Sequence, residues 1–350
     1  MSVDAVATSA QVGAGPARPV LDPNDPHTKL QKGVSAALQA LPGEFESKNE
    51  ISGVNATDLF SLNSFLGSGI ELEVVRTLNS LRQIWDPDSE WSTYRFERSA
   101  QAFPDVRLVN RGTEGEPIAI GIELKGWWML AKEKVPSLRY QVSPDACTDW
   151  DLVCCVPWHL DSAVSGVPVV AEPWVESAKY AAEWRDYWWT NIKETDGSAE
   201  LEYPADATPY PSKADRVTVH PVNDGGGNFG RLPRCRPLMD SFVESTMRVP
   251  ILGIETRAWV HFLKLHSESA GSDAVIEKMQ RQLKQLDKNV APDQAERILE
   301  QLRELAELLP SEVNQTFSGP FFMPGGSRAT ASHEAVADVG AGLLLGRVSQ

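Results

Sequence analysis

The sequence has few of the residues that build disulfide frameworks and zinc sites. Its 350 residues include four cysteines and six histidines, and neither set shows the spacing of a metal site. The cysteines are Cys147, Cys154, Cys155 and Cys235. Two of them are adjacent in an apolar run, so we expect buried, reduced thiols. A thiol nucleophile paired with His159 is disfavoured, because that run offers no acid to orient the histidine.

Long apolar runs and an excess of positive charge are missing as well. No segment approaches the ~18 apolar residues of a membrane-spanning helix, and the first residues lack the pattern of a signal peptide. We therefore expect a cytoplasmic protein with no membrane partner. The net charge of −15 argues against a protein that coats nucleic acid non-specifically, because such binding depends on Lys and Arg neutralising phosphates. It leaves a local basic cleft open.

The sequence does contain enough apolar side chains for a large core. Hydrophobic residues make up 42% of the chain and include eleven tryptophans, which is typical of a globular protein. Small residues, proline and glycine dominate residues 1–27, so we expect a flexible leader there. We expect the main folded core over residues 28–194, a loop-rich and helical region over 195–318, and a partly ordered tail over 319–350.

Periodicity predicts a mixed α/β core. The run "IELEVVRTLNSLRQIW" has helical spacing of its apolar residues, from Ile70 to Trp85. Alternating segments at 92–98, 104–110 and 118–125 predict strands, and "RGTEGEP" is a turn between the last two. The continuous apolar run "DWDLVCCVPWHL" is typical of a strand covered on both faces. We therefore expect a mixed central β-sheet flanked by helices.

Helical patterns continue in the second half of the chain. Trp174 and the residues after it have helical spacing, which predicts one long helix over residues 172–194. Residues 238–266 also read as helical. Two further helical segments within 273–309 are separated by "NVAPDQ", which predicts an antiparallel helical hairpin. Between these helices, residues 195–237 are rich in proline and glycine and predict a long ordered loop.

Two acids and a lysine lie at the ends of the predicted hairpin. Asp105 begins its first strand, and Glu123 and Lys125 end its second. Alternate residues of a strand share a face, so Glu123 and Lys125 point the same way. A strand, a turn and a return bring Asp105 beside Glu123. Carboxylate oxygens are the ligands that Mg²⁺ prefers, and an adjacent lysine can orient or deprotonate an attacking water.

The order Pro104-Asp105, then Glu123-Leu124-Lys125, resembles the PD-(D/E)XK signature of the restriction-endonuclease-like nucleases. The similarity covers roughly residues 65–160. It implies a restriction-endonuclease-like core in which Asp105 and Glu123 hold Mg²⁺ and Lys125 assists the water that attacks the phosphodiester. The upstream helix, the alternation, the turn and the downstream buried strand all agree with the family order.

The resemblance also implies an acid on the helix before the hairpin. Two residues match, Glu71 and Glu73. Glu71 follows Ile70 at the predicted start of the helix and is the first choice, although the sequence does not decide between the two.

Polar and basic residues elsewhere are candidates for contacts with DNA. One group follows a glycine-rich turn in "NFGRLPRCR", and the other lies just after the predicted catalytic strand. The candidates are Asn228, Arg231, Arg234, Arg236, Lys132, Lys134 and Arg139. An exposed basic loop on an acidic protein explains the first group equally well, and a solvated crossover explains the second.

These observations favour a Mg²⁺-dependent endonuclease that cuts double-stranded DNA, with a type II restriction enzyme as the leading hypothesis. The hairpin at 273–309 is a candidate dimer interface, since two sites acting on two strands suit a symmetric homodimer, or it packs on its own chain. One alternative is a repair, recombination or modification-dependent nuclease of the same superfamily. Another is a non-catalytic interaction protein with a nuclease-like fold.

Overall fold

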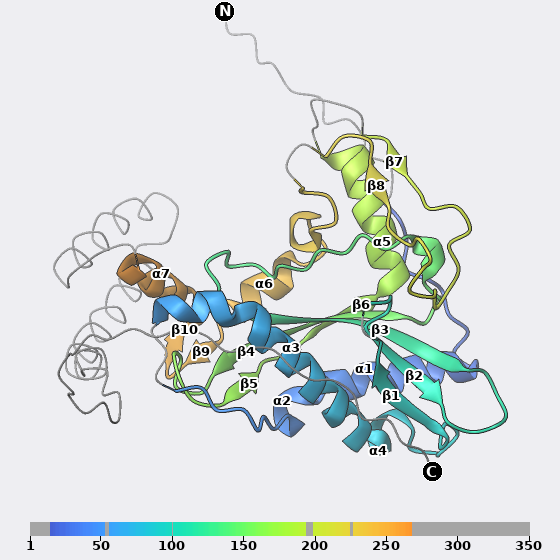
Figure 1. The fold of residues 1–350 in the computed structure, drawn as a ribbon, viewed down its shortest axis with the longest axis horizontal. Coiled ribbons are helices and arrows are strands. Elements are labelled where there is room, and N and C mark those ends of the chain that lie inside the picture. The colour runs from blue at the N-terminus through green and yellow to red at the C-terminus, as the bar shows by residue number, and fades with distance from the viewer. Residues whose placement is uncertain (1–14, 53–55, 100, 194–198, 225–226, 268–350) are drawn as a thin grey trace, which may run out of the picture.

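The computed structural model describes residues 15–52, 56–99, 101–193, 199–224 and 227–267 (Figure 1). The helical hairpin predicted at 273–309 and the predicted tail at 319–350 lie outside these residues, as does most of the predicted leader. No helix within the described ranges is long and apolar enough to cross a lipid bilayer.

A curled mixed sheet of six strands forms the centre of the fold, which confirms the predicted α/β class. Its order is β1-β2-β3-β4-β5, and β6 also pairs with β4. Neighbours are antiparallel except β3 and β4, which run parallel. The strands are β1 Tyr94–Arg98, β2 Val106–Asn110, β3 Ile118–Trp128, β4 Leu152–Leu160, β5 Pro168–Val170 and β6 Trp174–Ser177.

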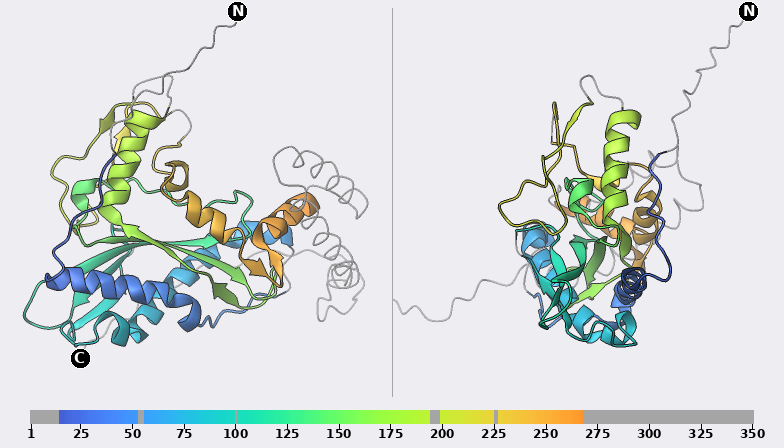
Figure 2. Two further views of the ribbon diagram at one scale, coloured as in Figure 1. Left: turned by 180° about the vertical axis from the view of Figure 1, so that it is seen from behind. Right: turned by 90° about the vertical axis from the view of Figure 1, so that its right-hand side faces the viewer.

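Helices pack on both sides of this sheet. Figures 1 and 2 show the first four helices on one side, and α5 with the small β7–β8 hairpin on the other. The helices are α1 Pro26–Gln39, α2 Leu41–Glu44, α3 Ala56–Ser80, α4 Arg82–Trp85, α5 Ala178–Tyr187, α6 Asp240–Thr246 and α7 Thr256–Ser267. The short strands are β7 Leu201–Glu202, β8 His220–Pro221, β9 Pro250–Ile251 and β10 Ile254–Glu255.

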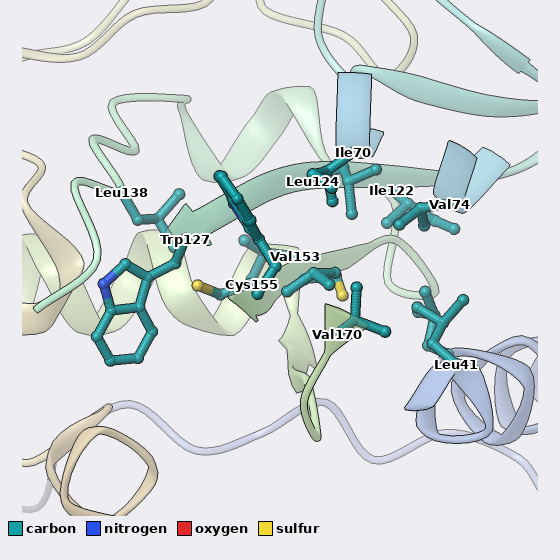
Figure 3. Close-up of a cluster of buried hydrophobic side chains, with 14 of the residues drawn as sticks. Leu41, Ile70, Val74, Ile122, Leu124, Trp127, Leu138, Val153, Cys155 and Val170 are labelled. Carbon is teal, nitrogen blue, oxygen red and sulfur yellow. The ribbon is translucent and has the colours of Figure 1, made fainter. Parts of the chain in front are cut away.

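The predicted apolar face of the third helix is buried against the sheet. Figure 3 shows Ile70 and Val74 of α3 facing Ile122 and Leu124 of β3, and all four are at most 2% exposed. The helix begins before the predicted stretch, because glycines 67 and 69 are accommodated inside it. All four cysteines are buried and free, as expected.

Two helices predicted in the second half of the chain are broken in the structure. Residues 174–177 form β6 instead of the first turn of a helix, because they pair with the edge of β4 left beside β5. Helix α5 begins at Ala178, where the side chain of Ser177 accepts a hydrogen bond from the N–H of Tyr180. The stretch 238–266 contains α6, the hairpin β9–β10 and α7. Gly253 at the tip, with φ of 82°, allows the turn that interrupts the helical pattern.

The connection from β3 to β4 is irregular, and the later loop-rich region packs against it. It has a single 3₁₀ turn, Pro144–Ala146, and no α-helix. Its backbone bonds to the later loop, with Tyr140 N–H donating to Gly230 O at 2.7 Å and Val219 N–H to Gln141 O at 2.8 Å. The fully buried Arg185 of α5 donates to the carbonyls of Tyr140 and Val142. These bonds fix the 199–237 region to the sheet domain.

Candidate active site

Asp105 and Glu123 lie opposite each other where the β2–β3 ladder ends. The last paired residues are Val106 and Ile122, so the next antiparallel position joins Asp105 to Glu123. The side chain of Glu123 accepts a hydrogen bond from Asp105 N–H at 3.3 Å, and that of Asp105 accepts one from Leu124 N–H at 3.3 Å. The carboxyl groups are thereby held side by side, as the sequence predicts.

The acids occupy a stretch of β3 that β2 does not cover. Strand β2 begins at Val106, whereas β3 continues to Trp128. Backbone N–H groups on this side of β3 therefore need other acceptors. Asp105 accepts from Leu124, and Glu71 of α3 accepts from Gly126 at 3.5 Å. Side-chain carboxylates thus continue the hydrogen bonding of the sheet along its open edge.

The structure separates the two glutamates that the sequence left as alternatives. Glu71 Oε2 forms an ion pair with Arg98, at the end of β1, with a distance of 3.2 Å. Its Oε1 reaches the open edge of β3. Glu73 is 4% exposed and points elsewhere, since its Oε1 accepts from Lys48 N–H and from the amide of Asn49. Glu71 therefore adjoins the acid pair, and Glu73 anchors the segment before α3.

The environment of the two acids raises both of their pKa values. Burial, followed by the negative charge of Glu71, raises the pKa of Asp105 to about 6. Burial, followed by the charge of Asp105, raises the pKa of Glu123 well above its ordinary value. The positive charge of Lys125 acts in the opposite direction on both groups. The site is therefore short of positive charge for three ionised carboxylates.

Lys125 has no hydrogen bond or ion pair with any residue that the structure describes. It is partly buried, and strand alternation puts it on the face of Glu123. Its charge acts on both acids. The ammonium is thus close to the carboxylates and is not engaged by another side chain of the described chain.

Within the described ranges, no group of three or more His, Cys, Asp or Glu side chains is arranged to hold a metal ion. A cation at this site would have Asp105 and Glu123 as protein ligands, and water or substrate oxygens would complete its coordination. That arrangement is usual for Mg²⁺, which typically keeps several waters and binds through one or two carboxylates.

Six of the seven predicted DNA-binding residues gather in two groups. In the first, Arg139 and Arg231 lie opposite each other in an isolated antiparallel bridge. Arg139 has an acid, Asp224, at 3.9 Å. Beside them, Arg234 donates to the side-chain oxygen of Asn228. Like charges directly opposite on neighbouring strands are destabilising, so this pair of arginines is suited to an anionic ligand.

The second group lies after the end of β3. Lys132 and Lys134 lie on the connection to β4. Partial burial of the Lys134 ammonium, followed by the charge of Lys264 on α7, lowers the pKa of Lys134. Burial, followed by the positive charges of Lys134 and Lys264, lowers the pKa of His261 on α7. Arg236 belongs to neither group: it is 79% exposed, and its nearest acid is Asp240 at 3.8 Å.

No family model matches this sequence, and no curated protein is similar to it. The likeness to the PD-(D/E)XK nucleases therefore depends on the residues and geometry described above.

The sequence did not indicate three residues near the acid pair. Arg98 pairs with Glu71. Asp151, just before β4, is completely buried, and burial raises its pKa to about 6. Tyr210 donates from its hydroxyl to Asp151 Oδ1 at 2.9 Å. The one sequence signal is the apolar run that follows Asp151. A carboxyl group at the start of a buried strand needs hydrogen-bond donors, although the sequence does not identify Tyr210 as one of them.

Proposed function

We propose that this protein is a Mg²⁺-dependent endonuclease acting on double-stranded DNA, most similar in its chemistry to the PD-(D/E)XK superfamily. The observation that carries the proposal is the opposition of Asp105 and Glu123 at the open edge of β3, with Lys125 on the same face. A site-specific restriction enzyme that acts against foreign DNA is the leading biological role.

The order of elements supports this proposal. A helix bearing Glu71 precedes three antiparallel strands, and a fourth strand runs parallel to the third. This is the order that the resemblance implies. The chain departs from a regular crossover, because the connection from β3 to β4 holds only a 3₁₀ turn.

The donor set fits Mg²⁺. Asp105 and Glu123 would hold the ion, and the repulsion that raises their pKa values would be relieved by a divalent charge. When bound, the ion would supply Lewis acidity toward the phosphate and a more acidic water. The remaining catalytic roles would belong to side chains of the protein. Lys125 orients the attacking water or accepts its proton, and its positive charge stabilises the additional negative charge on the phosphate.

The two basic groups would hold the DNA backbone. Arg139 and Arg231 occupy opposite positions of one antiparallel bridge, and Arg234 donates to the carboxamide oxygen of Asn228. Arginine binds phosphate oxygens and base edges through paired N–H donors. Lys132 and Lys134 extend the positive surface beyond β3. An acidic protein with a localised basic surface is expected to bind DNA in a salt-dependent manner.

Replacing both Arg139 and Arg231 by alanine is expected to weaken DNA binding by about tenfold to a hundredfold at low salt, because two phosphate contacts are lost. The slope of log affinity against log salt should fall by about two. Fluorescence anisotropy with a labelled duplex in Ca²⁺ measures both quantities. Arg216→Ala, at an exposed arginine that makes no hydrogen bond or ion pair within the described chain, is the matched control. An unchanged salt slope in the double variant would assign DNA binding to another surface.

The two glutamates of α3 are expected to behave differently. Glu71→Gln should lower the cleavage rate by about tenfold or more, because it removes an acid beside Asp105 and releases Arg98. Glu73→Gln keeps an acceptor oxygen for Lys48 and Asn49 and should cleave at nearly the wild-type rate. Single-turnover kinetics on one duplex compares them. Equal losses in both variants would contradict the assignment of Glu71.

The deciding experiment incubates purified protein with unmodified and modified plasmid and phage DNA, with Mg²⁺ or with EDTA. Discrete fragments that require Mg²⁺ support a site-specific nuclease. Cleavage only of modified DNA supports the modification-dependent alternative, and cleavage without fixed positions supports a repair or recombination role. A folded protein that cuts none of these substrates would support the non-catalytic alternative. Sedimentation of the same sample tests the proposed homodimer.

A further inference from the structure

Three residues from separate parts of the chain meet over one glycine of β3. A Cβ atom at Gly121 would lie 2.3 Å from Pro104 Cγ, 3.0 Å from Asp151 Oδ1 and 3.2 Å from Tyr210 Cε1. These distances leave no room for a side chain, so the contact requires glycine. Gly121 stands two residues before Glu123, and Pro104 directly precedes Asp105. The contact therefore involves β3 two residues before Glu123 and the segment before β2 one residue before Asp105.

Asp151 is the hydrogen-bonding centre of this contact. Its Oδ1 accepts from Gly121 N–H at 2.7 Å and from the hydroxyl of Tyr210 at 2.9 Å, and its Oδ2 accepts from Thr148 N–H at 2.7 Å. The side chain of Asp151 thus extends the pairing of β3 and β4 by one step beyond Leu152 and Ile122. A buried carboxyl group with three donors is held in one orientation.

Tyr210 brings the loop-rich region to this point. Its φ of 53° is uncommon for a bulky residue, so surrounding contacts must hold it in place. The adjacent Pro211 carbonyl accepts a hydrogen bond from Arg107 of β2 at 3.0 Å. The pair Tyr210–Pro211 therefore contacts β2 through Arg107, β3 through Gly121 and the start of β4 through Asp151.

We propose that Tyr210 is a positioning residue, which holds Gly121 of β3 through its ring and through its bond to Asp151, so that Glu123 stays opposed to Asp105. This inference deepens the proposed nuclease function and rests on it. Tyr210 would not touch the metal or the scissile phosphate. It belongs to the same loop-rich region that bonds to residues 139–142, where Arg139 lies. A change in that region on binding DNA would thus reach the acid pair through Tyr210.

The test uses the full chain with Tyr210→Phe, which keeps the ring and removes only the hydroxyl. The matched control is Tyr203→Phe, because the hydroxyl of Tyr203 also donates to a largely buried acid, Asp186, at 3.1 Å. We expect Tyr210→Phe to lower the single-turnover cleavage rate by about tenfold to a hundredfold, the range produced by a small misplacement of reacting groups. Its affinity for a duplex in Ca²⁺ should stay within about twofold. Tyr203→Phe should change neither quantity.

A second readout does not depend on cleavage. Amide hydrogen exchange over residues 118–128 should be faster in Tyr210→Phe than in wild type and unchanged in Tyr203→Phe. Only the Tyr210 variant loses a hydrogen bond to Asp151, the residue that binds β3 at Gly121. Wild-type exchange and cleavage in Tyr210→Phe would overturn the positioning role. Equal losses in both tyrosine variants would overturn it too, since they would reflect general stability. If the wild-type protein does not cleave DNA, the nuclease proposal fails, and the exchange experiment still decides whether Tyr210 holds this strand.

Discussion

Lys125→Ala and Asp105→Asn are each expected to lower the rate of Mg²⁺-dependent DNA cleavage by about a hundredfold to ten-thousandfold, with little change in DNA binding. The lysine variant removes the one ammonium close to both acids that is not engaged by another described residue. General acid–base assistance and stabilisation of developing charge are each worth roughly a hundredfold to a thousandfold or more. The aspartate variant removes one of two proposed metal ligands.

Single-turnover cleavage of one duplex at saturating protein separates the chemical step from binding. Lys213→Ala is the matched control for Lys125, because Lys213 is exposed and makes no side-chain hydrogen bond or ion pair within the described chain. It should cleave like the wild type. Raising Mg²⁺ should partly restore Asp105→Asn if the lost activity reflects weaker metal binding, and it should not restore Lys125→Ala. A Lys125 variant that cleaves at the wild-type rate would remove the lysine from the reaction.

Asp105→Asn is also expected to make the metal-free protein more stable than wild type at pH 8. The folded-state pKa of Asp105 is about 6, against an ordinary value of 3.8. The folded state therefore holds this proton more tightly than the unfolded state, and stability falls as pH rises from about 4 to 6. Above that window the ionised group costs up to about 3 kcal/mol, at 1.36 kcal/mol per pKa unit. Coupling to Glu123 makes about 1–3 kcal/mol the expected gain.

Urea unfolding in EDTA at several pH values measures this difference. The gain of Asp105→Asn over wild type should be largest near pH 8 and should disappear below about pH 3, where the wild-type group is protonated in both states. The raised pKa of Asp151 is present in both proteins and cancels in the comparison. Asp88→Asn, at an exposed acid, should show no such pH dependence. Saturating Mg²⁺ should stabilise the wild type more than the variant. A variant less stable than wild type at pH 8 would contradict this account of the site.

The sequence predicts the central fold well because periodicity reports burial directly. Alternation identifies β2 and β3, and the helical face from Ile70 to Trp85 is buried as expected. The prediction fails where tertiary pairing overrides local pattern. Trp174 and its neighbours fit a helical spacing, yet they form a strand because they pair with the unpaired edge of β4. The hairpin β9–β10 likewise interrupts a pattern that reads as helix over residues 238–266.

The acid pair could be predicted because its members flank one local hairpin. Glu71 could not be chosen over Glu73 from spacing alone, because helix packing decides which of the two faces the open edge of β3. Tyr210 and Asp151 were missed for a related reason. They are far apart in sequence and have no motif, and only the folded chain brings the loop-rich region against Gly121.

The uncovered half of β3 has a further consequence for solubility. An unpaired strand offers a template on which another chain can add, and natural proteins guard such edges with charged side chains. Glu71 and Asp105 already occupy the N–H groups of Gly126 and Leu124 on this edge. The acids proposed for catalysis would thus also protect the protein against aggregation through strand addition.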